Sequence, residues 1–453
     1  MERSYKTRRA KPFIGRRIMK ELRYDAAVIG AGAAGMAAAL ELDAAGFSCA
    51  LIDREDHLGG ILMQCIHNGF GLHEFSEELT GPEYAERFIE RVLKSKIAVY
   101  LNTTVTEFST GPHCGIAAPP ISVPHSLLPT PHSLLCISPE GVMRVQCRAL
   151  VLAMGCRERN RGNVLIPGSR PAGVFTAGLA QRLVNIEGYI PGKEVVIIGS
   201  GDIGLIMARR MSWIGCIVKA VIEIMPYPAG LTRNIVQCLR DFNIPLHLSC
   251  RTTNIFGNDR VEGVEVTPVE NGVPVWDKRF RIDCDTVLLS VGLVPENELS
   301  RAAGVEINGA TGGPLADSTL MTNLDGVFAC GNVLHVHDLV DMVSQESGAA
   351  GRYAAQWLSG IRPAMQIRAK AGANVRYVNP VRINPSKDNR VYLRPMAVKD
   401  NAVLELRLDN RLIRSVKKSL VQPSEMIMLN VSPNDFPGQT AGTDSVLEFS
   451  INN

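Results

Sequence analysis

Short apolar runs alternate with helical patterns along most of the chain. One such run ends at Ile29, an Ala-rich helical stretch follows it, and a second apolar run leads into Asp53. The same order returns over residues 194–223, and further buried strands are expected near 149–153 and 284–291. Strands that alternate with helices in this way are typical of βαβ units in a parallel sheet. The pattern therefore predicts an α/β fold with two such units.

Other segments are predicted to be helical or to form small sheets. Residues 82–96 repeat apolar side chains at helical spacing, and Pro82 suits a first helical turn. Residues 231–242 and 342–358 are also predicted helices. Residues 371–453 differ, because short β-rich runs alternate there with Asn- and Asp-containing turns. We expect this last part to be a small all-β domain without recognisable chemistry.

A glycine pattern follows the first strand. Gly30, Gly32 and Gly35 form G-x-G-x-x-G, and Asp53 ends the next strand 23 residues after Gly30. The glycines permit a tight turn, a close approach to a pyrophosphate, and close packing of helix on strand, while the helix N-terminus offers free N–H groups. Asp53 would accept ribose hydroxyls. The alternative is an ordinary glycine-rich turn.

The same pattern occurs a second time. Gly199, Gly201 and Gly204 follow the strand at 194–198, and Glu223 comes 24 residues after Gly199. Two copies at matching spacing predict two dinucleotide sites. An acidic residue at this position repels a 2′-phosphate and favours NADH over NADPH. Lys219 and Arg233 lie close enough in sequence to leave NADPH open.

Residues 111–139 interrupt this order. The segment is rich in proline and repeats Pro-His-Ser-Leu-Leu at 124–128 and 131–135. Such composition is atypical of a packed element and predicts a surface excursion between two strands. We expect His113, His125 and His132 to be solvated and not to bind metal.

Composition and charge exclude several classes of protein. The chain is 46% hydrophobic and 21% charged, as in globular proteins, and no apolar run approaches the roughly 20 residues of a membrane span. Residues 1–20 carry a local charge of +7, so the remainder carries −4 of the overall +3. We expect a disordered basic tail over residues 1–21, with Met19 as an alternative start, and no nucleic-acid partner.

Eleven cysteines are spread through the chain without a C-x-x-C pair. The odd count and the absence of an export signal predict reduced thiols and a cytoplasmic location. Cys65 and His67 lie in the mixed segment 61–75, which is either a loop facing a cofactor ring or a buried connector. His335 and His337 form H-x-H, but spacing suggests no further ligand, so no metal site is predicted.

Two dinucleotide units, one nested in the other, and the late Cys330-Gly331-Asn332 segment resemble the two-dinucleotide-binding-domain flavoproteins, which include glutathione and thioredoxin reductases. The resemblance implies two nested Rossmann-like domains plus the small β domain. It implies an FAD-binding domain at 22–165 and 296–370, and an NAD(P)-binding domain at 166–295. It also implies that FAD and NAD(P)H are the cofactors.

The resemblance also implies which residues contact the cofactors. Asn332 stands where the family has Asp, and Met154 replaces the Thr of an A-T-G motif. The FAD-side positions are Gly30, Gly32, Ala33, Ala34, Gly35, Asp53, Arg54, Gly60, Val105, Ala153, Gly155, Gly331 and Asn332. The NAD(P)-side positions are Gly199, Gly201, Asp202, Ile203, Gly204, Glu223 and Gly292.

A narrower resemblance rests on the segments 59–71, 223–239 and 328–341. They resemble the FAD subunits of hydrogen cyanide synthase, opine oxidases, heteromeric sarcosine oxidase and dye-linked proline dehydrogenase, and the flavoprotein encoded beside anaerobic glycerol-3-phosphate dehydrogenase. This group implies that the redox partner is a small molecule, another flavoprotein, a second copy of the chain or an iron–sulfur subunit. The redox cysteine pair of the disulfide reductases is not recognisable.

The leading hypothesis is an oxidoreductase that transfers hydride between NAD(P)H and FAD and exchanges electrons with a partner flavoprotein or small acceptor. One alternative is a direct amine or hydroxy-acid dehydrogenase with a histidine base. Another is a cofactor-holding subunit without catalysis, and the least favoured is a thiol reductase. Cys65, His67 and His337 are the candidate catalytic residues, with packing or solvation as the alternative for each.

Overall fold

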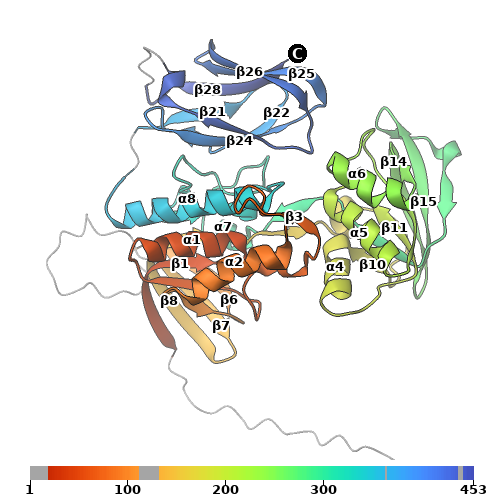
Figure 1. Ribbon diagram of the computed structural model, residues 1–453, viewed down its shortest axis with the longest axis horizontal. Helices are drawn as coiled ribbons and strands as arrows, with labels where there is room; N and C mark the ends of the chain where they lie inside the picture. Colours follow the sequence, from red (N-terminus) through yellow and green to blue (C-terminus); the bar gives the residue numbers. More distant parts are fainter. Residues whose placement is uncertain (1–18, 112–131, 363–364, 437–441, 453) are drawn as a thin grey trace, which may run out of the picture.

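A computed structural model describes residues 19–111, 132–362, 365–436 and 442–452. The basic N-terminal segment, His113 and His125 lie outside these ranges. Figure 1 shows a first α/β unit in red and orange, a second in green, and a blue β domain above the helix α8.

The first unit is built on a mixed sheet in the order β5-β2-β1-β8-β7-β6, with β20 also paired to β8. Strands β1, β2, β5, β8 and β20 run parallel, while β6 and β7 are antiparallel. Their bounds are β1 Lys20–Ile29, β2 Cys49–Ile52, β5 Ala98–Tyr100, β6 Thr104–Thr110, β7 His132–Ser138, β8 Gly141–Leu152 and β20 Val327–Ala329.

Three helices lie between this sheet and the β domain: α1 Ala33–Ala44, α2 Gly81–Leu93 and α8 Val340–Leu358 (Figure 1). Their close packing depends on a small residue. A Cβ on Gly351 of α8 would lie 2.3 Å from the carbonyl oxygen of Ala38 in α1, so only glycine allows this approach. Smaller elements complete the unit: β3 Asn68–Phe70, β4 Leu79–Thr80 and α7 Glu298–Ala302.

The expectation for residues 132–139 was wrong. This stretch forms β7, which pairs with β6 and, through the turn at 139–140, with β8. Leu134 and Cys136 point into the core. His132 is fully buried and not solvated, and its Nε2 lies beside Gly326. Burial lowers the pKa of His132 to about 4.

The second unit has a parallel sheet in the order β10-β18-β11-β12-β13. A separate antiparallel group, β14–β17, packs beside it. The strands are β10 Val174–Thr176, β11 Glu194–Ile198, β12 Ile217–Ile222, β13 Leu246–His247, β14 Cys250–Gly257, β15 Val261–Glu270, β16 Val273–Pro274, β17 Phe280–Ile282 and β18 Thr286–Leu289. The helices are α3 Arg161–Val164, α4 Ala177–Asn185, α5 Asp202–Trp213 and α6 Thr232–Cys238.

The chain enters and leaves the second unit side by side. Strand β9, Cys156–Glu158, pairs antiparallel with β19, Leu293–Pro295. The second unit is thus an insertion in the first.

The C-terminal part contains a five-stranded sheet, β23-β21-β28-β25-β26, and a three-stranded sheet, β22-β24-β27. We expected this domain to start at residue 371, and its first paired strand begins at Ile367. The bounds are β21 Ile367–Ala371, β22 Val375–Asn379, β23 Arg382–Ile383, β24 Asn389–Pro395, β25 Lys399–Leu408, β26 Arg411–Val421, β27 Ile427–Val431 and β28 Val446–Asn452. An apolar core fills the domain.

Candidate functional site

The first glycine loop is shaped by contacts that exclude side chains. Gly30 has a φ of +104°, and a Cβ there would lie 2.3 Å from the carbonyl oxygen of Ala153. A Cβ on Gly35 would lie 1.7 Å from the carbonyl oxygen of Gly30. Gly32 differs, because a Cβ on it would meet no protein atom within 4 Å. Gly30 and Gly35 are therefore required by the fold, whereas Gly32 borders open space.

The N-terminus of α1 is available to an anion. Its N-cap, Gly32, offers no side-chain cap, and the first turn carries no acidic residue. Gly59 donates its N–H to the carbonyl oxygen of Ala31 at 3.0 Å and pairs as a bridge with Gly32. Gly60 follows beside the Cα of Gly32. Two glycine loops thus border one helix terminus with free N–H groups, which fits the pyrophosphate of FAD.

Asp53 closes one side of this region. Its carboxylate accepts N–H hydrogen bonds from Ala31 at 2.5 Å and from Glu55 at 2.9 Å. Each oxygen keeps a further lone pair for a ribose hydroxyl. Arg54, beside it, is exposed, and Val105 is buried in β6.

Segments far apart in sequence meet at this loop. Ala153 and Gly155 follow β8, and Ala153 contacts Gly30 as described above. Gly331, with a φ of +69°, lies against the first turn of α1, where its Cβ would come within 2.8 Å of Ala34. The structure thus brings together the first loop, the end of β8 and the late Gly331-Asn332 segment. Ala33, at the start of α1, lies in the same region.

The second glycine loop repeats the geometry of the first. Gly199 has a φ of +93°, and a Cβ there would lie 2.1 Å from the carbonyl oxygen of Ser290. Gly204 packs against the same serine and donates its N–H to the Ser290 hydroxyl oxygen at 3.0 Å. Gly201 is the N-cap of α5. Gly292, with a φ of +97°, accepts a hydrogen bond from the Arg159 N–H at 3.0 Å.

Glu223 is buried beneath this second loop. Its carboxylate accepts hydrogen bonds from the N–H of Ser200 at 2.9 Å, the hydroxyl of Ser200 at 2.6 Å and the N–H of Met225 at 2.9 Å. Asp202 and Ile203 begin α5. The Asp202 carboxylate accepts from the N–H of Leu231 at 2.8 Å, so it also holds the segment before α6. The acidic residue of the second unit is thus fixed at the loop, as in the first.

Cys65 lies in a buried contact between the two units. Its thiol is 3.3 Å from the carbonyl oxygen of Ile61 and 3.6 Å from Oε1 of Gln181 in α4. Burial raises the pKa of the Cys65 thiol to about 12. The cysteines of the described residues are all free, so Cys65 has no disulfide partner there. These contacts support the buried-connector alternative for Cys65.

His67 belongs to the same connector. Its Nδ1 is 3.2 Å from the carbonyl oxygen of Asn68, and its ring lies 4.9 Å from that of Phe70. Burial lowers the pKa of His67, and the charges of Arg209 and Arg233 lower it further. The side chain therefore faces the second unit. The N–H groups of Gly71, His73 and Glu74 donate to the Asp341 carboxylate of α8, which fixes the end of the connector.

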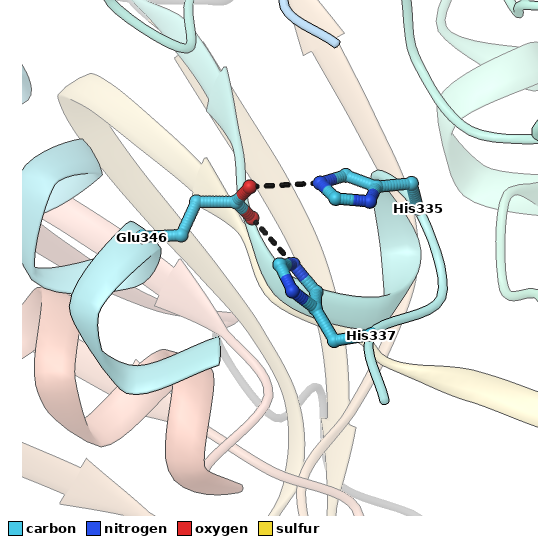
Figure 2. A group of neighbouring side chains, drawn as sticks. All are labelled: His335, His337 and Glu346. Atoms are coloured by element: carbon cyan, nitrogen blue, oxygen red, sulfur yellow. Dashed lines mark hydrogen bonds and ion pairs between the residues drawn. The ribbon is translucent and has the colours of Figure 1, made fainter. Parts of the chain in front are cut away.

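His337 lies in a buried group that spacing did not predict (Figure 2). Its Nε2 is 3.2 Å from Oε1 of Glu346, while Nε2 of His335 is 2.8 Å from Oε2 of the same carboxylate. Glu346 lies in α8 and was missed, because a single polar residue in a helix is usually interpreted as exposed. A helix face that is buried, as on α8, is the signal that would have identified Glu346 as a buried residue.

This group touches the predicted flavin contacts. Gly331 donates its N–H to Oε1 of Glu346 at 2.8 Å, and Asn332 accepts the N–H of His337 at 3.0 Å. The Asn332 amide also lies 3.6 Å from the sulfur of Cys156. The Gly331-Asn332 turn is therefore fixed by hydrogen bonds to Glu346 and His337, and His335 contacts the same carboxylate.

Comparison with known proteins decides the family. Residues 24–349 match the pyridine nucleotide-disulphide oxidoreductase family. The chain belongs to this family. The family is one of oxidoreductases, and the prediction of an α/β fold with two Rossmann-like units is confirmed.

Curated relatives are distant and include subunits of oxidases. The chain is 26% identical to an opine oxidase subunit of Agrobacterium tumefaciens over 333 residues, covering 68% of this chain and 61% of that protein. It is 26% identical to hydrogen cyanide synthase subunit HcnB of Pseudomonas protegens, covering 76% and 70%. The chain thus spans about 60% of the length of the opine oxidase subunits that it matches. The predicted resemblance to the opine oxidase and hydrogen cyanide synthase subunits is confirmed.

Solved structures show the same fold. A thioredoxin reductase from T. acidophilum superposes with a TM-score of 0.59 at 22% identity, covering 74% of this chain and 98% of that one. An L-proline dehydrogenase from P. horikoshii gives 0.51 at 17% identity, covering 77% and 58%. In the part of the chain that the structure describes, no helix is long and apolar enough to span a membrane.

Proposed function

We propose that this chain is the NADH-linked FAD subunit of an electron-transferring oxidoreductase, with a partner flavoprotein, an iron–sulfur protein or a small acceptor as its redox partner. The observation that carries this proposal is the pair of glycine loops, each with a buried or hydrogen-bonded acid beside it. When bound, the two cofactors supply hydride transfer between the nicotinamide and the flavin. The protein's own part is to hold and align them.

The preference for NADH rests on Glu223 and on its cationic neighbours. Glu223 places a carboxylate at the second loop, where it disfavours a 2′-phosphate. Lys219 forms an ion pair with Glu194 at 2.8 Å. Arg233 packs against Gly69 of the first unit. Both cations that would favour NADPH therefore have other contacts.

A dithiol mechanism finds little support. Cys65 has a raised thiol pKa, is buried, and contacts a carbonyl oxygen and Gln181. The nucleophile in thiol chemistry is the thiolate, which this environment disfavours. His67 and His337 remain candidates in the direct-dehydrogenase alternative, although His337 is hydrogen-bonded to Glu346.

The partner proposal rests on the relatives. The opine oxidase and hydrogen cyanide synthase relatives are both subunits by name. We propose that this chain, like them, works beside a different protein chain or beside a second copy of itself. The cytoplasmic location remains a prediction, and so does similarity to the flavoprotein encoded beside anaerobic glycerol-3-phosphate dehydrogenase.

The test is an anaerobic titration of the FAD-loaded full chain with NADH and then NADPH, followed by the oxidised-flavin absorption band. We expect bleaching by NADH at lower concentration than by NADPH. Bleaching by an amine or hydroxy acid without nicotinamide would instead favour the direct dehydrogenase. No bleaching by any of these would overturn electron transfer in the isolated chain and favour a cofactor-holding subunit.

A further inference from the structure

Three metal-binding side chains converge in the interior, at the boundary between the first unit and the β domain. His335, His337 and Glu346 are 0%, 8% and 3% exposed, and one ligand atom from each lies within 4.8 Å of the others. The histidines come from the loop after β20 and the glutamate comes from α8, and Figure 2 shows both rings turned toward the carboxylate.

The spacing of these atoms suits a shared ion. Adjacent ligands at about 2.0–2.2 Å from a metal, at angles between octahedral and tetrahedral, are roughly 2.8–3.5 Å apart. The two Nε2-to-carboxylate separations, 2.8 and 3.2 Å, fall in that interval. The ligand atoms lie within 4.8 Å of one another, so a ring rotation would be needed to bring all three to one ion.

The charge of the group also favours a cation. The Glu346 carboxylate lies between the two imidazole rings, with one oxygen 2.8 Å from Nε2 of His335 and the other 3.2 Å from Nε2 of His337. Among the described residues, no lysine or arginine is paired with Glu346. A buried carboxylate is costly unless its charge is compensated, and a bound cation would compensate it.

Two further polar atoms remain unexplained. The Nδ1 atoms of His335 and His337 are buried, and no hydrogen-bond partner is found for them among the described residues. An ion bound through Nε2 would leave both Nδ1 atoms without a partner, as a purely hydrogen-bonded cluster would, so these atoms do not distinguish the two arrangements.

One member of the group borders a pocket. Glu346 borders a pocket of about 600 Å³ between α1, α8 and the β domain. Its lining also includes Tyr392, Asn379 and Arg352. The ring of Tyr392 lies 5.2 Å from that of His335 and 5.3 Å from that of His337. The pocket therefore reaches Glu346, while His335 and His337 are not among its lining residues.

We propose that His335, His337 and Glu346 bind one divalent transition-metal ion of the type that favours mixed imidazole and carboxylate ligands, with Zn²⁺ and Fe²⁺ as the leading choices. Two histidines and one carboxylate leave coordination positions open. Because Gly331 also donates to Glu346, the ion would lie beneath the predicted flavin-contacting turn. The site is independent of the electron-transfer proposal.

The test uses the full chain, stripped with a chelator and then dialysed against Co²⁺ or Zn²⁺. We expect about one ion per chain by elemental analysis, and a visible Co²⁺ spectrum typical of nitrogen and oxygen ligands. Glu346→Gln and His337→Ala should each weaken binding at least tenfold, whereas exposed His73→Ala should not. Far-UV circular dichroism and FAD content identify any variant that fails to fold.

Two results would overturn the site. The first is that the wild-type chain retains well below one ion per chain after dialysis. This result would show that the three side chains form only a hydrogen-bonded cluster, and it requires no variant. The second is bound metal whose affinity and Co²⁺ spectrum are unchanged in Glu346→Gln, which places the ion elsewhere. Neither outcome bears on NADH bleaching of the flavin, so the two proposals fail separately.

Discussion

Arg394 of the β domain forms a two-point ion pair with Asp338 of the first unit. The nitrogen–oxygen distances are 2.8 and 3.2 Å, and one guanidinium nitrogen also donates to the carbonyl oxygen of Val336 at 3.1 Å. Asp338 follows His337 directly, and its carboxylate accepts the N–H of Met426 as well. The β domain thus holds the loop that carries both histidines.

We expect Arg394→Ala to loosen this contact. The pair is largely buried, with side-chain exposures of 12% and 24%, so leaving Asp338 without this partner should cost about 1–3 kcal/mol. Urea unfolding and limited proteolysis of the full chain measure the effect. Arg407→Ala is the matched control, because Arg407 pairs with Glu405 inside the β domain. Equal sensitivity of the two variants would contradict the docking role of Arg394.

The Gly32→Ala variant tests whether Gly32 is required for folding or for FAD binding. A Cβ at Gly32 meets no protein atom within 4 Å, and its φ of −74° suits alanine. We expect unchanged stability of the FAD-free chain but FAD binding weakened at least tenfold, because the new methyl group would occupy pyrophosphate space. FAD titration by fluorescence measures this change.

The control for Gly32→Ala is Gly46→Ala. That position also has open space around it, but it lies at the other end of α1, with a φ of +85°. It should lose some stability from backbone strain and keep its FAD affinity. Normal FAD affinity in Gly32→Ala would show that the pyrophosphate lies elsewhere.

The sequence predicted the two nucleotide-binding units because their signals are local. Each glycine loop, such as that around Gly30, follows its strand directly and precedes its helix, so neighbouring residues carry the whole pattern. The insertion of one unit in the other follows from the order of these patterns. The same reasoning identified the β-rich C-terminal part through its turns.

Two features depend on contacts between distant residues and were not predicted. Strand β7 lies in a proline-rich stretch, and its place in the sheet comes from pairing with β6 and β8. Glu346 meets His335 and His337 only because α8 turns one face inward over the loop after β20. The local composition of the sequence does not indicate either contact.

We expect the thiol of Cys65 to be unreactive toward alkylating reagents. With a thiol pKa of about 12, only about one molecule in ten thousand is a thiolate at pH 8. We expect no alkylation of Cys65 by iodoacetamide at this pH, with labelling read by peptide mass spectrometry. Cys65→Ser should keep NADH-dependent flavin bleaching. Loss of bleaching in a folded Cys65→Ser chain would instead support the hypothesis of a thiol reductase.

His132 should make stability depend on pH. Its pKa is about 4 in the folded chain against 6.5 for an ordinary histidine, so the unfolded chain binds more protons between these values. The stability is present above pH 6.5 and is lost as pH falls toward 4, by up to about 3 kcal/mol. Urea unfolding at pH 7 and pH 4.5 measures the loss.

His132→Gln should flatten this pH dependence, since glutamine does not titrate. Exposed His73→Gln is the control and should leave it unchanged. The same slope in His132→Gln and the wild-type chain would show that other groups cause the acid sensitivity.

Glu223→Gln should shift the choice of nicotinamide cofactor. The carboxylate disfavours a 2′-phosphate, and glutamine keeps its shape without the charge. We expect the preference for NADH over NADPH to fall by about tenfold, equivalent to about 1.4 kcal/mol. Anaerobic flavin bleaching by each cofactor measures the ratio.

Because Ser200 and Met225 donate hydrogen bonds to Glu223, the thermal stability of the Glu223→Gln variant must be measured beside the assay. Glu187→Gln, on the surface beside Arg182, is the control. A folded Glu223→Gln chain with an unchanged ratio would mean that Glu223 only anchors Ser200 and does not select the cofactor.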